Sequence, residues 1–541
     1  MGKSGEHGAV ATCVRTAVQH AMDTALTEVE CGFARGFAGV QLIGNTSDIC
    51  RNGKERARAA LEHLGFLFPP QKILINLAPA DVRMDGNHLD LPMAVSLSLL
   101  VSAARPKVEF RQWLFAGELG LFGELKPIRG VVSFAISAAR AGFAGIVVPE
   151  GNLREIAALR RVKLPNFESL QIRAFSCLRE VLDWLRSPDK VCNDEENHPL
   201  PPIAKGGPDF DDMCLTPVVE LAALAAATGL HSMLMRGTPG SGKSMLAARL
   251  PSLLPVMERD RHIEAMSIHS SHSERLGEGL LAGRPVWRAP HHHASAGALL
   301  GTVESPGELS LAHGGVLFLD EFPEFRRDLL ESLREPLETG EVSLSRTKRK
   351  VVWKSRILLL GACNNCPCGW AGSLRRACDC PASRMLAYRQ KLSGPVLDRI
   401  DIHLNMPELP GDAADLFLRL RNQRAGSDAG VRKTEELARR VRVARSFGAD
   451  RNRRFHAEVN RDLPADGLIE ASGLTPDDFA GIVNGIIPAS TSNRSTIRAI
   501  KVARTLADLS GSSVIRSADL VQAWSWQAEK AAEDRGELVL Q

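Results

Sequence analysis

Eight consecutive residues, Gly237-Thr238-Pro239-Gly240-Ser241-Gly242-Lys243-Ser244, match the glycine-rich phosphate loop G-x-x-x-x-G-K-S without a departure. A short apolar segment precedes them and a helix-compatible segment follows, so the strand–loop–helix context of the motif is present. In that context the glycines let backbone N–H groups face phosphates, Lys243 reaches the β- and γ-phosphate oxygens, and Ser244 ligates magnesium. We therefore predict that this loop, together with Met245, binds a nucleoside triphosphate and Mg²⁺. A chance glycine turn is the alternative.

A second motif is the apolar run 316–319, which ends in two carboxylates, Asp320 and Glu321. After a phosphate loop, a buried strand of this kind delivers its first carboxylate to the magnesium shell. We predict that Asp320 does so and that Glu321 polarises the attacking water as general base. Taken alone, such a strand end would more often be structural.

Two polar residues further along the chain complete the predicted site. Asn364 follows another strand-like run, where a side-chain amide beside the γ-phosphate would hold the water in line; a turn asparagine is the alternative. Arg399 lies on a predicted turn, and a guanidinium supplied by a neighbouring subunit stabilises the charge that builds on a transferred phosphoryl group. This role predicts an oligomer, whereas an ion pair with Asp398 or Asp401 is the competing interpretation.

Length and composition indicate a multidomain globular protein. The 541 residues suggest three or four domains, and the contents of 44% hydrophobic and 24% charged residues are globular values. No apolar run reaches the roughly 18 residues that span a bilayer, and the N-terminus has no apolar signal core. We therefore expect a cytoplasmic protein with no membrane partner. The formal net charge of +4 neither requires nor excludes nucleic acid.

Periodicity and composition divide the chain into four parts. Residues 1–186 alternate strand-like and helical runs and predict an α/β domain, whereas the polar, Pro/Gly-rich residues 187–213 are typical of a linker. Residues 214–407 show the pattern of a parallel nucleotide-binding sheet. Helical periodicity dominates afterwards, so 408–541 is predicted to be a helical lid.

The order of these motifs resembles that of AAA+ ATPases, and the sequence between them resembles the ComM/YifB family, also called magnesium-chelatase-like. The matching stretches are Trp287-Arg288-Ala289-Pro290-His291-His292, Pro306-Gly307-Glu308-Leu309-Ser310-Leu311-Ala312-His313, Cys366-Pro367-Cys368-Gly369 and Ser393-Gly394-Pro395-Val396-Leu397-Asp398-Arg399-Ile400-Asp401. The resemblance runs over nearly the whole chain. It implies an α/β fold with an AAA+ parallel-sheet core and a helical lid. It also implies that Arg399 is the arginine finger and Arg494 the second sensor, with Arg498 as its competitor.

The same resemblance implies an ATP-driven motor, a homo-oligomer of six copies, that acts on single-stranded or branched DNA. Family members of this kind are branch-migration helicases of natural transformation. The alternative is a magnesium-chelatase-like ATPase that remodels a protein partner. One departure from the family concerns recognition of the nucleotide's base. Cys214-Leu215 stands where relatives usually carry Gly-Gln for the adenine pocket.

Basic residues indicate where a nucleic acid would bind. Residues 341–356 read as a hairpin with a cationic tip, and no acid lies within 342–356 to balance its cations, which are Arg346, Lys348, Arg349, Lys350, Lys354 and Arg356. In a ring such hairpins would point into the pore and neutralise phosphates; a solvated hairpin end is the alternative. The insertion 266–312 predicts a second pore loop, in which Trp287 would stack on bases beside Arg288. A metal site at the triple histidine 291–293 is disfavoured, because consecutive residues of a regular element do not face one ion.

Four cysteines form two closely spaced pairs, Cys366 with Cys368 and Cys378 with Cys380. Four thiolates suit a tetrahedral structural zinc, although one-residue spacing within a pair is less usual than two. Reduced, unligated cysteines and a redox pair are the alternatives.

Residues 25–185 resemble the family's N-terminal domain, whose fold is akin to the proteolytic domain of Lon protease. The stretches that carry the resemblance are 76–81, 89–94, 117–120 and 127–131. A Lon-like protease needs a serine nucleophile and a lysine base. Asp90 stands where the serine would fall, and the lysine region reads Val131-Val132-Ser133, so we expect a domain that lacks the catalytic dyad. Docking of DNA or positioning of the ring is its expected role.

Overall fold

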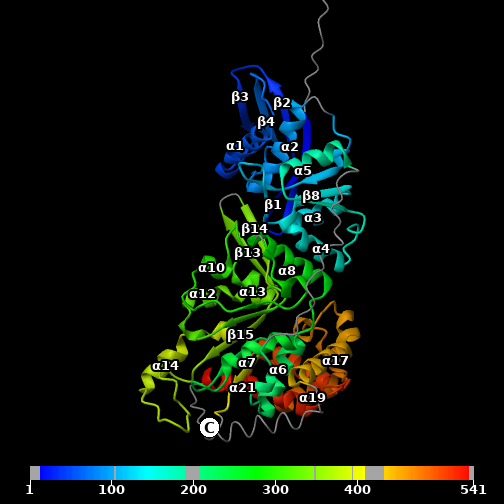
Figure 1. Ribbon diagram of the computed structural model, residues 1–541. Coiled ribbons are helices and arrows are strands. Elements are labelled where there is room, and N and C mark those ends of the chain that lie inside the picture. Colours follow the sequence, from blue (N-terminus) through cyan, green and yellow to red (C-terminus); the bar gives the residue numbers. More distant parts are fainter. Residues whose placement is uncertain are drawn as a thin grey trace, which may run out of the picture.

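The computed structural model describes residues 12–102, 105–188, 208–273, 275–346, 349–392, 394–408 and 432–534. They form three parts that follow one another along the molecule (Figure 1): an N-terminal domain, a central domain and a C-terminal helical domain. Most of the predicted linker lies outside the described residues. Its last part does not behave as a linker, because Phe210 is fully buried in the core of the central domain.

The N-terminal domain is built on a mixed seven-stranded sheet in the order β3-β4-β2-β1-β5-β8-β9. Its strands are β1 (Thr12–His20), β2 (Asp23–Ala34), β3 (Gly39–Ile43), β4 (Lys72–Ala78), β5 (Trp113–Phe115), β8 (Gly145–Pro149) and β9 (Gln171–Phe175), with a small hairpin of β6 (Glu118–Leu119) and β7 (Leu125–Lys126). β2 runs antiparallel to β1 and β4, whereas the β3–β4, β1–β5, β5–β8 and β8–β9 pairs are parallel. The α/β prediction for this part is confirmed.

Helices cover both faces of this sheet. They are α1 (Asp48–His63), α2 (Asp90–Val101), α3 (Val131–Arg140), α4 (Leu153–Arg161) and α5 (Leu178–Arg186). Side chains alternate along each strand, so β5 sends Phe115 into the cluster with α1, α2 and α5 and Leu114 into the cluster with α3 and α4. The domain therefore has two cores, one on each face of the sheet.

The central domain contains a five-stranded parallel sheet in the order β11-β12-β15-β10-β16. Its strands are β11 (Trp287–Arg288), β12 (Val316–Leu319), β15 (Leu358–Cys363), β10 (Met233–Arg236) and β16 (Ile402–Asn405). Every residue of β12 and β15 is buried, as expected of parallel strands covered on both faces. The predicted parallel sheet is confirmed, and all five carboxyl ends meet at one edge.

Helices and a separate hairpin surround that sheet. The helices are α6 (Pro217–Gly229), α7 (Lys243–Arg249), α8 (Arg259–His272), α9 (Glu278–Leu281), α10 (Ala296–Leu300), α11 (Glu308–Leu311), α12 (Arg327–Ser332), α13 (Arg334–Thr339), α14 (Ala382–Gln390) and α15 (Gly394–Leu397). The hairpin pairs β13 (Glu341–Arg346) with β14 (Arg349–Lys354) and points toward the N-terminal domain (Figure 1). Its base is fixed because Val342 and Trp353 are buried in the central domain.

Described residues after 432 form helices: α17 (Lys433–Arg454), α18 (Leu468–Ser472), α19 (Pro476–Ile486), α20 (Asn493–Leu509) and α21 (Ser517–Asp534). α17, α20 and α21 share one apolar core with α6, β10 and β16 of the central domain. The C-terminal helices are thus packed on the edge of the sheet that ends in β16.

The N-terminal domain packs on α8 of the central domain. Ser270 of α8 accepts the Gly130 N–H on its carbonyl at 2.8 Å and the Val132 N–H on its Oγ at 3.4 Å, so it caps the start of α3. Glu155 of α4 is 3% exposed and accepts the Leu276 N–H at 3.1 Å. Burial raises the pKa of Glu155 to about 8. Apolar side chains of α8 and α9 complete the core on this face of the N-terminal sheet.

Candidate functional site

The predicted phosphate loop connects β10 to α7 and turns sharply before the helix. Gly240 and Gly242 have φ angles of +79° and +88°, a left-handed conformation that glycine adopts without strain. The Lys243 ammonium donates to the carbonyls of Gly237 at 2.8 Å and Thr238 at 2.9 Å. The loop thus has the concave form that receives phosphates at the start of a helix.

Asn364 lies beside this lysine. It follows β15, the neighbour of β10 in the sheet, and its Oδ1 accepts a hydrogen bond from Lys243 Nζ at 3.2 Å. Burial lowers the pKa of Lys243. The Asn364 amide is therefore within reach of Lys243 and of a phosphate group that Lys243 would bind.

The predicted magnesium ligands meet at the same edge. Asp320 follows β12, and its Oδ2 accepts a hydrogen bond from Ser244 Oγ at 3.0 Å. A hydroxyl and a carboxylate oxygen this close form the donor set that Mg²⁺ takes beside phosphate oxygens. The chemistry of these two residues therefore fits a magnesium-bound triphosphate.

Glu321 has a partner that the sequence did not disclose. His292 Nδ1 lies 3.0 Å from Glu321 Oε2, and the Glu321 backbone is left-handed with φ +51°. The histidine comes from the segment between β11 and α10, inside the predicted insertion. The ligand atoms of all three consecutive histidines lie within 4.8 Å of one another, although the sequence reasoning disfavoured such convergence. The available signal in the sequence was that His292 lies in one of the stretches that carry the family resemblance, before the strand that ends at Asp320 and Glu321.

Arg399 and Arg494 lie together but away from the phosphate loop. Both guanidinium groups contact Glu338 Oε1 at 2.8 Å. They line a cavity of about 500 Å³ with Ser232 and Ile357, which precede β10 and β15, so this cavity lies at the amino edge of the sheet. Neither arginine can thus serve the phosphate loop of its own chain.

The ion pairs around these arginines involve an acid that the sequence reasoning missed. Arg399 is 6% exposed and pairs with Glu338 of α13. Asp401, one of its predicted competing partners, accepts a hydrogen bond from Arg498 at 3.2 Å, and neighbouring positive charge lowers the pKa of its buried carboxyl. Glu338 is therefore the residue that brings the two predicted arginines together.

Two residues predicted to contact DNA, Trp287 and Arg288, interact with other residues of the protein instead. The Trp287 ring stacks on Phe318 of β12 with centroids 5.5 Å apart. Arg288 donates two hydrogen bonds to the Glu308 carboxylate at 2.6 and 2.5 Å. Because β11 is the edge strand beside β12, its side chains pack the insertion against the sheet, and we do not include them in a nucleic-acid surface.

The hairpin has fewer available cations than its sequence suggested. Lys354 pairs with Glu341 at 2.6 Å, and Arg356 lies 3.9 Å from Glu458. Lys350 is exposed at the tip. Lys348 and the side chains of Arg346 and Arg349 lie outside the described part of the chain. Of the predicted hairpin cations whose side chains the structure describes, Lys350 is therefore the one at the tip.

Cys366, Cys368, Cys378 and Cys380 converge, with all four sulfurs within 4.8 Å of one another. Three of the separations are 3.3, 3.6 and 3.6 Å, close to the about 3.8 Å between ligands of a tetrahedral zinc with Zn–S bonds of about 2.3 Å. The Ala371 N–H also points at Cys366 Sγ at 3.3 Å, a contact that supports thiolate ligands. The four residues therefore fit a zinc ion.

The two dyad positions of the N-terminal domain have structural partners. Asp90 is fully buried, accepts hydrogen bonds from Arg56 at 2.7 and 3.0 Å, and has its pKa raised by burial to about 6. The lysine region at Val132 lies at the start of α3, under Ser270 of the central domain. Asp90 and Val132 are thus both held by contacts inside the protein.

A parallel sheet with a phosphate loop, two carboxylates and an asparagine at its carboxyl edge defines a P-loop ATPase of the AAA+ type. Comparison with known sequences agrees. Profiles described as magnesium chelatase subunit ChlI, subunit ChlI of Mg-chelatase and the ChlI C-terminal region match residues 209–414, 29–152 and 431–527.

Full-length relatives identify the family. The chain is 32% identical to competence protein ComM of Haemophilus influenzae over 510 residues, 93% of this chain and 94% of the relative. It is 33% identical to YifB of Salmonella typhimurium over 504 residues, 92% of this chain and 94% of the relative. The chain belongs to the magnesium-chelatase-like ComM/YifB family. It is also 28% identical to Lon protease 2 of Syntrophobacter fumaroxidans over 167 residues, 26% of this chain.

Among the described residues, no helix is long and apolar enough to cross a membrane.

Proposed function

We propose that this ATPase is a ring-forming motor of six copies that acts on DNA. The observation that carries the proposal is that the phosphate-loop residues and the pair Arg399 and Arg494 lie at opposite edges of one sheet. A ring of identical chains would bring the amino-edge arginines of one copy to the carboxyl-edge loop of the next. A cytoplasmic location belongs to the same proposal, and cell fractionation tests it.

Within one chain, the loop residues hold the triphosphate and its metal. When bound, Mg²⁺ and ATP supply the reactive γ-phosphoryl group and the charge that offsets its oxygens. Lys243 would exchange its carbonyl partners for phosphate oxygens, while Ser244 and Asp320 would turn from each other toward the metal. Asn364 would orient the water, and Glu321 would accept its proton once it is free of His292.

The neighbouring copy would complete the site. Arg399 and Arg494 carry two positive charges that share one carboxylate, and a γ-phosphoryl group offers several oxygens to the same guanidinium groups. Transition-state charge is stabilised more strongly than the ground state by such groups, so they would act on turnover more than on binding.

The hairpin tip is the proposed contact with DNA. β13 and β14 form the hairpin, Lys350 is exposed near its tip, and the sequence adds the positive charges of Arg346, Lys348 and Arg349, which would neutralise phosphates. Movement of the C-terminal helices with the nucleotide state would shift the base of the hairpin through Arg356, which contacts Glu458 and Asp462 at 3.9 and 3.7 Å.

The test is the steady-state ATPase rate of the full chain with no DNA, with single-stranded DNA, with forked DNA and with duplex. We expect stimulation by single-stranded or forked DNA, and loss of stimulation with salt. The double variant Lys348→Glu, Lys350→Glu should lose stimulation and keep the DNA-free rate. Lys107→Glu, an exposed lysine of the N-terminal domain, is the matched control. An ATPase rate that no DNA changes would favour a protein substrate instead.

We also propose that the four converging cysteines hold a structural Zn²⁺. Gly369, between them, lies against the phosphate loop, where an added Cβ would stand 2.7 Å from Pro239 Cγ. Metal analysis of the purified chain should give one zinc per chain, and Cys378→Ser should lose it while Cys177→Ser, a distant cysteine, should keep it. A fully loaded Cys378→Ser variant would contradict the assignment.

A further inference from the structure

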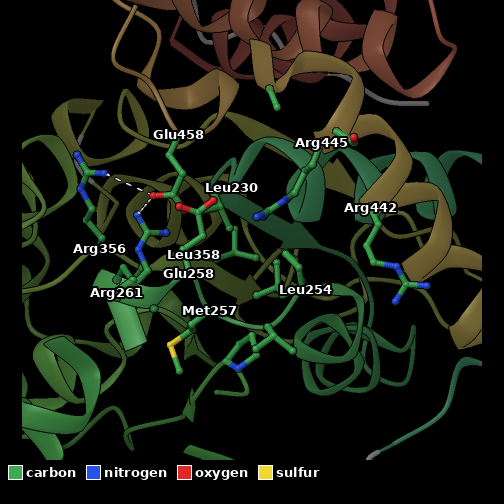
Figure 2. A pocket seen from close by; sticks show the side chains of 18 residues that line it. Leu230, Leu254, Met257, Glu258, Arg261, Arg356, Leu358, Arg442, Arg445 and Glu458 are labelled. Atoms are coloured by element: carbon green, nitrogen blue, oxygen red, sulfur yellow. Dashed lines mark hydrogen bonds and ion pairs between the residues drawn. The ribbon is translucent and has the colours of Figure 1, made fainter. Parts of the chain in front are cut away.

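A second cavity lies between the central domain and the C-terminal helices. Its volume is about 300 Å³, at the lower end of the range for small-molecule sites. α8, the segment that joins the hairpin to β15, and α17 all contribute side chains to it (Figure 2). None of the phosphate-loop residues, all of which the structure describes, lines it.

The cavity is lined by more cationic than anionic side chains, and only some of the cations have a carboxylate partner. Four arginines, Arg261, Arg356, Arg442 and Arg445, face two acids, Glu258 and Glu458. Glu458 is occupied on one side of the cavity, because Arg261 and Arg356 both contact its Oε2 (Figure 2). The two arginines of α17 have no such carboxylate partner within the described chain.

Arg445 is the least satisfied of these cations. Its Nη2 donates to the carbonyl of Ala227 at 2.6 Å, and its Nε is buried without a partner among the described residues. Among the same residues, no carboxylate oxygen comes within 4.0 Å of its guanidinium. Burial lowers the pKa of Arg445 to about 10. Figure 2 shows the side chain running from α17 toward the middle of the cavity. Glu458 and Glu258 attract this cation from a distance, but a largely buried guanidinium without a direct ion pair is costly, and a bound anion would lower that cost.

Most of the remaining lining is apolar, with Ser446 as a polar exception. Leu230, Leu254, Met257 and Leu358 are part of it, as Figure 2 shows. Leu230 has a left-handed backbone with φ +54° at the end of α6, a conformation that branched apolar residues rarely adopt. Such strained positions occur where a site needs a side chain in one place.

We propose that this cavity binds a small organic phosphate of the size of a nucleoside monophosphate. The phosphate would lie between Arg445 and Arg442, whose planar guanidinium groups suit two phosphate oxygens each. The organic part would lie on Leu230 and Leu254. Because α17 belongs to the C-terminal helices and α8 to the central domain, the ligand would tie the two together.

Calorimetric titration of the full chain carrying Lys243→Ala, which weakens triphosphate binding at the phosphate loop, tests this. The probes are AMP and inorganic phosphate. We expect one AMP per chain, bound more tightly than inorganic phosphate. Adding Arg445→Gln should weaken AMP binding roughly tenfold or more, the usual effect of losing a charge-assisted hydrogen bond to phosphate. Adding Arg442→Gln, at an exposed position, should weaken it roughly threefold, because solvent screens its charge.

Arg439→Gln is the matched control, since Arg439 is exposed on the same helix and does not line the cavity. It should leave AMP affinity unchanged. AMP affinity that is equal in the Arg445, Arg442 and Arg439 variants would overturn the proposal. Equal affinities for AMP and inorganic phosphate would overturn the assignment of an organic ligand. If the Arg445 variant does not fold, the comparison of Arg442 with Arg439 decides.

Discussion

The two edges of the central sheet differ in how complete they are. At the carboxyl edge, Lys243 contacts Asn364 and Ser244 contacts Asp320, so these four residues form a preorganised half-site. At the amino edge, Arg399 and Arg494 lie away from the phosphate loop of their own chain, and both pair with Glu338.

This difference is the basis of the proposal that the nucleotide-binding groups and the groups that act on the transition state come from different copies of the chain. A chain that carries both halves on opposite edges can assemble head to tail, and only the assembled form brings them together. Under this proposal, turnover depends on contact between subunits as well as on nucleotide. The following changes break or sharpen that comparison.

The largest effect is expected at the carboxyl edge. Lys243→Ala removes the only ammonium in the loop, so the ATPase kcat should fall more than about 100-fold, as is common when a group that stabilises phosphoryl charge is lost. Steady-state phosphate release measures it. Lys391→Ala, an exposed lysine paired with Glu324, should retain the full rate. Normal turnover by the Lys243 variant would place the nucleotide elsewhere.

Arg399→Ala should lower kcat about 100-fold with little change in KM, because the charge acts on the transition state of a neighbouring site. A mixture of this variant with Lys243→Ala should regain part of the rate, since some interfaces would pair an intact loop with an intact arginine. Rates measured against the mixing ratio test this. A mixture no faster than its components would argue against action between copies.

Arg494→Ala should lower kcat about tenfold, less than Arg399→Ala. The loss is smaller because Arg399 would still supply one positive charge to the neighbouring site. Arg498, one helical turn further along α20, is held by Asp401 at 3.2 Å and should not replace the lost charge. Steady-state phosphate release by the Arg494 and Arg399 variants gives the ranking. Arg453→Ala, which alters an exposed arginine of α17, should keep the full rate. A larger loss for Arg494 than for Arg399 would reverse the two roles.

His292→Ala should raise the DNA-free ATPase rate about threefold to fivefold, because Glu321 loses the partner that holds it. Stimulation by DNA should shrink by a similar factor if the insertion normally releases the glutamate. His292→Asn, which keeps a donor near the carboxylate, should behave more like the unchanged protein. A lowered rate in both variants would instead assign His292 a role in aligning Glu321.

The smallest effect concerns stability. Burial raises the pKa of Glu155 from 4.5 to about 8, so the folded state holds its proton more tightly than the unfolded state. This contribution is complete below about pH 4.5 and is lost as pH rises toward about 8. Glu155→Gln should therefore unfold at a temperature that depends less on pH across this window. Parallel pH profiles for the two proteins would show that Glu155 does not titrate there.

The carboxyl edge could be predicted from sequence because its residues lie in local motifs, either in the phosphate loop with the start of its helix or directly after a strand. Asp320 and Asn364 belong to such strand ends, and parallel strands bring their ends together without further information. The amino edge could not be predicted in this way. The approach of Arg494 to Glu338 joins α20 to α13, and nothing in the periodicity of either helix specifies that contact.

Residues of the insertion show a second reason. Trp287 and Arg288 have the composition of a nucleic-acid loop, but the two-residue strand β11 places them on Phe318 and Glu308. So short a strand gives no periodic signal, and its pairing with β12 depends on the whole sheet. The role of His292 was also missed, because it follows β11 whereas its partner Glu321 follows β12, and the contact depends on the pairing of these two strands.

The capping of α3 by Ser270 has a practical consequence for dissecting the protein. A fragment that ends near residue 188 would leave the amides of Gly130 and Val132 facing water and would uncover apolar side chains that α8 and α9 now shield. A fragment that starts near residue 208 would expose the opposite side of the same contact. Neither piece is a natural unit, so the two halves are best expressed, purified and studied as a single chain.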